Sequence, residues 1–243
     1  SKIEAGRIEV ERLETDLPCL TGSLPVNDHS EAAGLVPEYT PEIPLWVQLP
    51  YYEQEGMIAQ FAPGMPGLKH GNSKIFVDSS SEAFENDLLE FYEAFMGVQD
   101  GAADIEDSMF AMAPETAPGF FRLLQNLENT SDAVAAVKGQ ITGPFTFGTG
   151  LTDENGKALF YDEQLRDAAV KLLAMKARWQ TRLLAKFQKP VMVFFDEPAL
   201  TAFGSSAYIS ISKDEVAQCF EEVFDAVHAE GGLAGVHVCA NAD

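Results

Sequence analysis

The chain is short of positive charge. Its 243 residues include 16 Lys and Arg against 38 Asp and Glu, which gives a formal net charge of −22. A chain with so few cations has no basic stripe that could displace the counterions of a nucleic acid, and anionic lipid repels it. We therefore expect no nucleic-acid partner and no membrane partner, and we interpret the excess carboxylates as a solubilising surface.

Cysteine and long apolar runs are also scarce. Cys19, Cys219 and Cys239 are far apart and odd in number, so they do not form a disulfide framework. A reducing cytoplasm is therefore the expected location. No window of about 18 apolar residues is available to span a membrane. The charged N-terminus lacks the apolar core of a signal peptide, which disfavours secretion.

Apolar residues nevertheless make up 46% of the chain, which is enough for the core of a globular domain. They include five short runs rich in Val, Ile, Leu or Phe, each closed by residues that favour turns. This pattern is typical of strands buried on both faces of a parallel sheet. The runs are Pro18–Leu24, Pro44–Pro50, Val137–Phe147, Pro190–Pro198 and Leu233–Cys239.

Long amphipathic stretches separate these runs and predict helices. The clearest are Ser81–Gln99, Glu163–Phe187 and Ser212–Glu230. Strands that alternate with helices indicate a parallel sheet, and α/β barrels run to roughly 250 residues as one unit. We therefore expect a single α/β domain over residues 1–243. The expected fold is a TIM (β/α)8-type barrel that is incomplete at the C-terminus, with about five strands present.

Polar side chains follow every predicted strand. The strand ends read Gly22-Ser23-Leu24-Pro25, Gln48-Leu49-Pro50, Thr142-Gly143-Pro144, Asp196-Glu197-Pro198 and His237-Val238-Cys239. Gly and Pro at these points are explained as ordinary punctuation of strands, but Ser, Asp, His and Cys are not. Because catalytic groups of α/β barrels lie at the carboxyl ends of the strands, we expect one shared pocket there.

Two of these strand ends carry recognisable chemistry. His237 and Cys239 are two residues apart on a strand, so both side chains can face one Zn²⁺ ion. Taken by themselves they are better explained as a packed pair, because two ligands do not make a zinc site. Asp196 and Glu197 are adjacent and therefore point in opposite directions, so only one of them faces the pocket. Asp196 is interpreted either as the cap of the following helix or as the partner of a substrate ammonium.

Together the strand ends resemble the catalytic barrel of the cobalamin-independent methionine synthase family, in the superfamily that includes uroporphyrinogen decarboxylase. The matching motifs are Gly22-Ser23-Leu24-Pro25, Thr142-Gly143-Pro144, Asp196-Glu197-Pro198-Ala199-Leu200 and His237-Val238-Cys239. They occur in the order of the family and cover roughly Cys19 to Asp243. Four ordered motifs are more specific than any one of them.

The resemblance implies a zinc-dependent thiol methyltransferase. Zinc held by His237 and Cys239 would bind homocysteine or a similar small-molecule thiol as its thiolate. The thiolate would take a methyl group from a methylated folate or from a corrinoid protein. The resemblance assigns Asp196 as the catalytic anion that pairs with the substrate ammonium, and Ser23 as a second ligand of the amino-acid part. Substrate-binding residues on the donor side would be Thr142, Gly143 and Pro144.

Two departures from the family limit these expectations. The 243 residues supply no second, N-terminal barrel of the kind that the large synthase has, and we expect the family's remaining zinc ligands, a glutamate and a cysteine, to follow the His237-Val238-Cys239 strand. We therefore expect zinc in the intact protein, and weak or absent zinc binding by this chain. An unpaired edge at the fifth strand could be covered by another copy, which would give a homo-oligomer.

Three alternatives stay open: a corrinoid-linked methyltransferase, a uroporphyrinogen decarboxylase-like enzyme and a non-catalytic barrel fragment. The decarboxylase would need an arginine-rich turn after the first strand, and Gly22–Pro25 contains no arginine.

Overall fold

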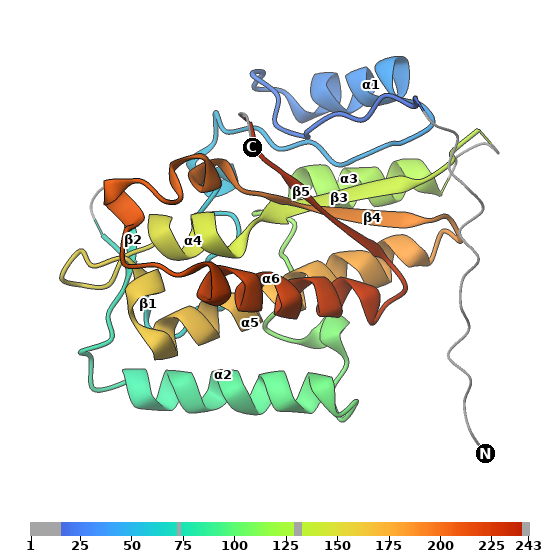
Figure 1. Cartoon of the computed structure of the whole chain (residues 1–243). Coiled ribbons are helices and arrows are strands. Elements are labelled where there is room, and N and C mark those ends of the chain that lie inside the picture. Colours follow the sequence, from blue (N-terminus) through green and yellow to red (C-terminus); the bar gives the residue numbers. More distant parts are fainter. Residues whose placement is uncertain (1–15, 72–73, 129–132, 240–243) are drawn as a thin grey trace.

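A three-stranded parallel sheet organises the computed structural model, which describes residues 16–71, 74–128 and 133–239 (Figure 1). The strands lie in the order β3 (Val137–Thr142), β4 (Val191–Asp196) and β5 (Leu233–His237). A separate antiparallel pair consists of β1 (Leu68–His70) and β2 (Ile75–Val77). The register aligns Thr142 with Asp196, and Asp196 with His237, so the carboxyl ends of all three parallel strands lie at one level.

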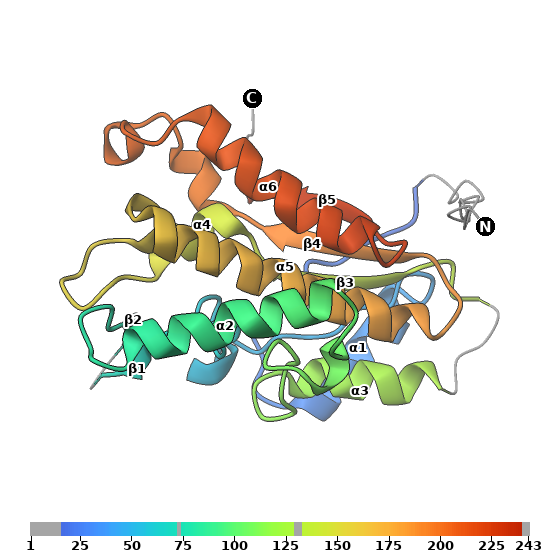
Figure 2. The same ribbon diagram turned by 90° about the horizontal axis from the view of Figure 1, so that it is seen from below.

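Helices cover one face of this sheet. Helix α5 (Glu163–Ala185) packs against β3 and β4, and α6 (Lys213–His228) packs against α5 and β5. Helix α2 (Phe84–Gln99) lies on the far side of α5, and Figure 2 shows the three helices side by side. Helix α1 (His29–Tyr39) contacts α3 (Pro118–Leu127), and its buried Ala32 and Val36 pack with Leu45 and Val47 of the segment that lies beside β3 (Figure 1).

The sequence accounts for these helices locally. Ser212 and Glu215 form the capping box of α6, and Asp162 accepts hydrogen bonds from the first free amides of α5. Gly139 faces α5, where an added Cβ would lie 2.9 Å from Gln180 Oε1. Because side chains alternate along a strand, the neighbours of Gly139 on β3 point to the opposite face of the sheet.

The expected TIM barrel is wrong. The part of the chain that the structure describes forms no barrel, although the α/β class and the parallel sheet are present. Three of the five predicted runs are regular strands, and Pro18–Leu24 and Pro44–Pro50 are not. These two runs join the sheet only through isolated parallel bridges.

The bridges place the two irregular runs beside β3 in chain order. Ser23 pairs with Gln48, and Leu45 pairs with Lys138. Proline at positions 18, 25, 44 and 50 supplies no amide to a ladder, and Gly22 has a φ of 106°, which interrupts an extended backbone. The local sequence therefore favours single contacts over a continuous ladder.

Within the described ranges, no helix combines the length and the apolar character that crossing a bilayer requires.

Candidate functional site

The carboxyl ends of β4 and β5 bring together three side chains that the sequence singled out. Asp196 Oδ1 lies 3.0 Å from His237 Nδ1, and His237 Nε2 lies 3.8 Å from Cys239 Sγ. Asp196 and His237 are the last residues of adjacent strands and are partners in the register. The sheet register itself therefore sets this row of carboxylate, imidazole and thiol.

The contact with Asp196 determines how His237 is presented. A carboxylate beside Nδ1 favours the proton on that nitrogen and leaves the lone pair on Nε2. The free nitrogen faces Cys239, whose side chain is exposed. The His237 side chain is 31% exposed, so this side of the row is open to solvent.

Asp196 is a carboxylate in a poorly solvated position, with its side chain 14% exposed. Burial raises the pKa of Asp196, and the nearby positive charge of Lys138 and the contact with His237 partly offset that rise. The charges of Asp196, Lys138 and His237 therefore influence one another.

Glu197 points away from this row, as the alternation of a strand requires. Its buried carboxylate accepts hydrogen bonds from Phe145 N and Thr146 N, both at 2.8 Å, and from Thr146 Oγ1 at 2.6 Å. These donors form the first turn of α4 (Pro144–Gly150). Burial raises the pKa of Glu197 to about 7. Its own amide donates to His237 O at 2.8 Å, so Glu197 joins α4 to β5.

The predicted residues Thr142 and Gly143 make structural contacts. Thr142 Oγ1 donates to Met57 O at 2.6 Å, and Gly143 N donates to Asp196 O at 2.9 Å. A Cβ on Gly143 would collide with the carboxylate of Glu197, so this position requires glycine. The predicted Pro144 begins α4, where its missing amide costs nothing.

Ser23 forms no hydrogen bond with Asp196, His237 or Cys239 in the part of the chain that the structure describes. It lines a hollow of about 760 Å³ together with residues 24–27, Glu31, Pro50 and Tyr51, and the lining includes neither Asp196, nor His237, nor Cys239. The structure thus groups Asp196, His237 and Cys239 and places Thr142 and Gly143 on the adjoining backbone. Ser23 lines a hollow whose lining does not include those three side chains.

Sequence reasoning missed two buried polar residues of β3. Lys138 is 2% exposed and Gln140 is fully buried. Gln140 Nε2 donates to Trp46 O at 2.6 Å, and Lys138 Nζ donates to Leu20 O at 2.9 Å. The signal was present as Lys, Gln and Thr at alternate positions of a run that was interpreted as an apolar strand.

His29, which belongs to none of the sequence motifs, makes a partly buried contact. Its Nε2 lies 2.7 Å from Glu55 Oε1, and Glu55 Oε2 accepts the amide of Leu49 at 2.9 Å. Glu55 is 2% exposed, so this pair fixes the backbone where the second predicted run ends.

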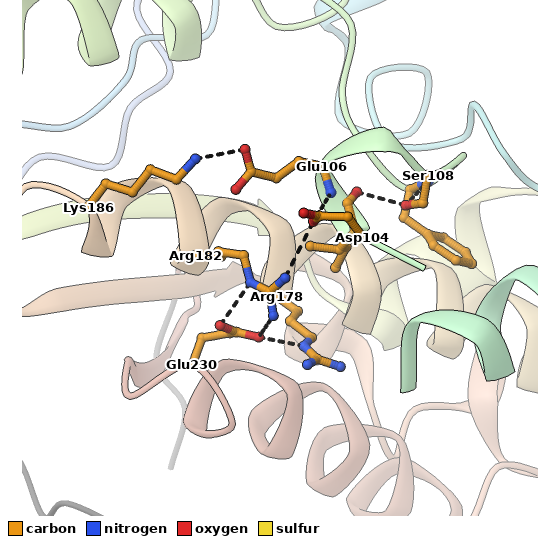
Figure 3. Close-up of polar contacts among 9 residues, drawn as sticks. Asp104, Glu106, Ser108, Arg178, Arg182, Lys186 and Glu230 are labelled. Carbon is orange, nitrogen blue, oxygen red and sulfur yellow. Dashed lines mark hydrogen bonds and ion pairs between the residues drawn. The ribbon is translucent and has the colours of Figure 1, made fainter. Parts of the chain in front are cut away.

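A second polar cluster, which we call the α5–α6 clamp, consists of Arg178, Arg182 and Glu230 (Figure 3). Glu230 Oε1 lies 2.7 Å from Arg178 Nε and 2.8 Å from an Arg182 nitrogen. Burial raises the pKa of Glu230, but the hydrogen bonds from the two arginines together outweigh it and lower the pKa. The charged groups of the α5–α6 clamp are paired with one another, which indicates that the clamp has a structural role.

His237 and Cys239 fit two of the ligands of a zinc ion. Nitrogen and sulfur atoms bound to one tetrahedral zinc at the usual bond lengths lie about 3.6 Å apart, close to the 3.8 Å between Nε2 and Sγ. Among the described residues, no group of three or more His, Cys, Asp or Glu side chains is arranged to hold a metal. These two side chains therefore form at most part of a zinc site.

Comparisons with known proteins add no relative. No family model, curated protein or solved structure matches this chain. The chemistry of the site is therefore inferred from the geometry above and from the motifs.

Proposed function

We propose that this chain contributes the thiol-binding and part of the zinc-binding site of a zinc-dependent thiol methyltransferase of the methionine synthase kind. The observation that carries the proposal is the row of Asp196, His237 and Cys239. A carboxylate on the far nitrogen of a histidine is the usual support of a zinc-bound imidazole. The thiol of Cys239 supplies the sulfur that zinc favours.

Each residue has a separate task. Zinc, when bound, lowers the pKa of a coordinating thiol, so the thiol is a thiolate at neutral pH. His237 and Cys239 hold the metal through Nε2 and Sγ. Asp196 orients His237 through Oδ1. Among the described residues, no side chain donates a hydrogen bond to the second carboxylate oxygen, Oδ2. That oxygen supplies the negative charge for the ammonium of homocysteine or a similar amino-acid thiol.

The methyl donor is a methylated folate or a corrinoid protein, and the location is the cytoplasm. All three cysteines are free, which suits a thiol enzyme in a reducing compartment.

A decarboxylase is the weaker candidate. Binding the carboxylates of a porphyrin requires cations or free amides at the strand ends. Glu197 already occupies the amides that begin α4. The predicted strand ends carry no arginine.

Cobalt(II) is the probe for this proposal, because a thiolate bound to it absorbs in the near ultraviolet. We expect weak binding by the chain, since it offers two ligands, with an absorption that Cys239→Ser abolishes. Cys19→Ser, which removes another exposed thiol, should leave the absorption intact. L-homocysteine should increase it. A Cys239→Ser spectrum equal to the wild type, or no response to homocysteine, would contradict the proposal.

Asp196→Asn separates the two tasks of Asp196. The amide oxygen still accepts from His237 Nδ1, so cobalt binding should persist. The lost charge should weaken the response to homocysteine by about tenfold or more, because a hydrogen bond to a charged group contributes about 1.5–3 kcal/mol. The response to 3-mercaptopropionate, which has no ammonium, should not weaken. Equal weakening for both thiols would rule out the ammonium assignment.

A further inference from the structure

The segment that carries Ser23 is attached to the sheet by few backbone contacts. Leu24 N donates to Gln48 O at 3.0 Å, and Gln48 N donates to Gly22 O at 2.9 Å. These two bonds form one isolated bridge and not a ladder. The segment therefore needs other contacts to keep a fixed position.

Lys138 supplies such contacts from β3. Its Nζ donates to Leu20 O at 2.9 Å and to Thr21 O at 3.3 Å, immediately before Gly22. The same ammonium lies 5.1 Å from the centre of the Phe194 ring. Two carbonyls and an aromatic face partly replace the water that a buried ammonium loses.

Lys138 also lies on the face of the sheet that carries the candidate site. Phe194 and Asp196 are two residues apart on β4, so they share a face, and the ammonium of Lys138 lies over the Phe194 ring. The positive charge of Lys138 acts on Asp196. One side chain therefore contacts the Ser23 segment and faces the strand that holds Asp196.

We propose that Lys138 is a positioning residue that fixes the turn at Gly22 and Ser23 relative to the row of Asp196, His237 and Cys239. The attachment itself follows from the contacts of Lys138 and does not depend on any activity. Its consequence for a thiol substrate rests on the proposed function and on the role that the resemblance implies for Ser23, which is to hold the amino-acid part of the thiol.

Hydrogen exchange tests the attachment. Lys138→Met keeps the apolar stem and removes the donor, so the amides of Leu24 and Gln48 should exchange about tenfold faster or more. The amides of Gly143 and Glu197, which bond across the carboxyl ends of the strands, should keep their protection. Lys138→Arg, which retains charge and donors, should restore most of the protection. Unchanged exchange at Leu24 and Gln48, or equal loss at all four amides, would overturn the proposal.

A matched control distinguishes this effect from general destabilisation. Lys171→Met makes the same change on α5, where the ammonium binds Asp167 and Glu222, and it should not change exchange at Leu24 and Gln48. If Lys138→Met does not fold, Lys138→Gln replaces it, because its shorter amide cannot serve both carbonyls. The expected exchange is the same.

The consequence for substrate is measured with cobalt-loaded protein. Lys138→Met should weaken the response to L-homocysteine several-fold, while the affinity for cobalt and the response to 3-mercaptopropionate stay unchanged. If the wild-type protein does not respond to homocysteine, the proposed function fails, and the exchange experiment still decides whether Lys138 holds the turn. A normal homocysteine response in Lys138→Met would refute the link to Ser23.

Discussion

Single buried charges are the most unusual residues of this protein, and Lys176 is the extreme case. It lies on α5 with 1% of its surface exposed, and burial lowers its pKa to about 8. No carboxylate in the described part of the chain pairs with its ammonium. An unpaired buried ammonium opposes folding, because the charged form loses its hydration.

Lys176→Met should therefore stabilise the protein at pH 7, by about 1–3 kcal/mol. The pKa of a lysine falls from 10.5 to about 8 on folding, so between these values the folded chain releases a proton that the unfolded chain keeps. The wild type thus gains stability as the pH rises through this window, and the variant does not. Urea unfolding at pH 7 and pH 10 measures the difference, which should shrink at pH 10. A difference in stability that is independent of pH would show that the buried charge of Lys176 does not destabilise the wild type.

The residues with the strongest sequence signals were also those whose partners the sequence could not give. The motifs identified Asp196, His237 and Cys239, and the alternation along a strand placed Glu197 opposite Asp196. The donors that bind Glu197 come from a helix some fifty residues earlier in the chain. Such long-range contacts depend on how the strands are arranged, which local sequence does not encode.

At the scale of elements, the junction of β4, β5 and α4 depends on the side chain of Glu197. Its carboxylate caps α4, and its amide holds the end of β5. The α5–α6 clamp joins the C-terminal end of α6 to α5. It does so through the carboxylate of Glu230 and two guanidinium groups of α5.

Glu197→Gln should destabilise the protein by about 1–3 kcal/mol. One carboxylate oxygen becomes an NH2 group that faces the donating amide of Thr146, so a buried donor loses its acceptor. The matched control is Glu215→Gln in the capping box of α6, which is only partly buried and should cost less than about 1 kcal/mol. Both are measured by urea unfolding at pH 8. Equal losses of stability in the two variants would show that the buried hydrogen bonds of Glu197 contribute no more than those of a capping box.

Elements with a strong local pattern were predictable. The expected helix over Ser212–Glu230 is α6 (Lys213–His228), and that over Glu163–Phe187 is α5 (Glu163–Ala185). The first two predicted strands are wrong, although both runs are apolar. Their proline residues supply no amide to a ladder, and the positive φ of Gly22 interrupts the extended backbone.

At the scale of the whole molecule, the sheet has two unlike faces. Helices α5 and α6 cover one face, and the other carries Lys138, Phe194 and Asp196 along β3 and β4. The predicted barrel followed from counting five runs and from the resemblance. A closed barrel needs eight strands whose ladders continue around a circle, and the described residues form one parallel sheet of three strands and a separate antiparallel pair. The order of the segments was correct, but the continuity of hydrogen bonding was not predictable from apolar runs.

X-ray absorption at the zinc edge tests the central claim, that Asp196, His237 and Cys239 form part of a zinc site for a thiol substrate. With zinc alone, the wild type should show one nitrogen at about 2.0–2.1 Å and one sulfur at about 2.3 Å among its ligands. Adding L-homocysteine should add a second sulfur at the same distance, and Cys239→Ser should remove one. Coordination by oxygen and nitrogen alone, or a spectrum that homocysteine leaves unchanged, would contradict the account.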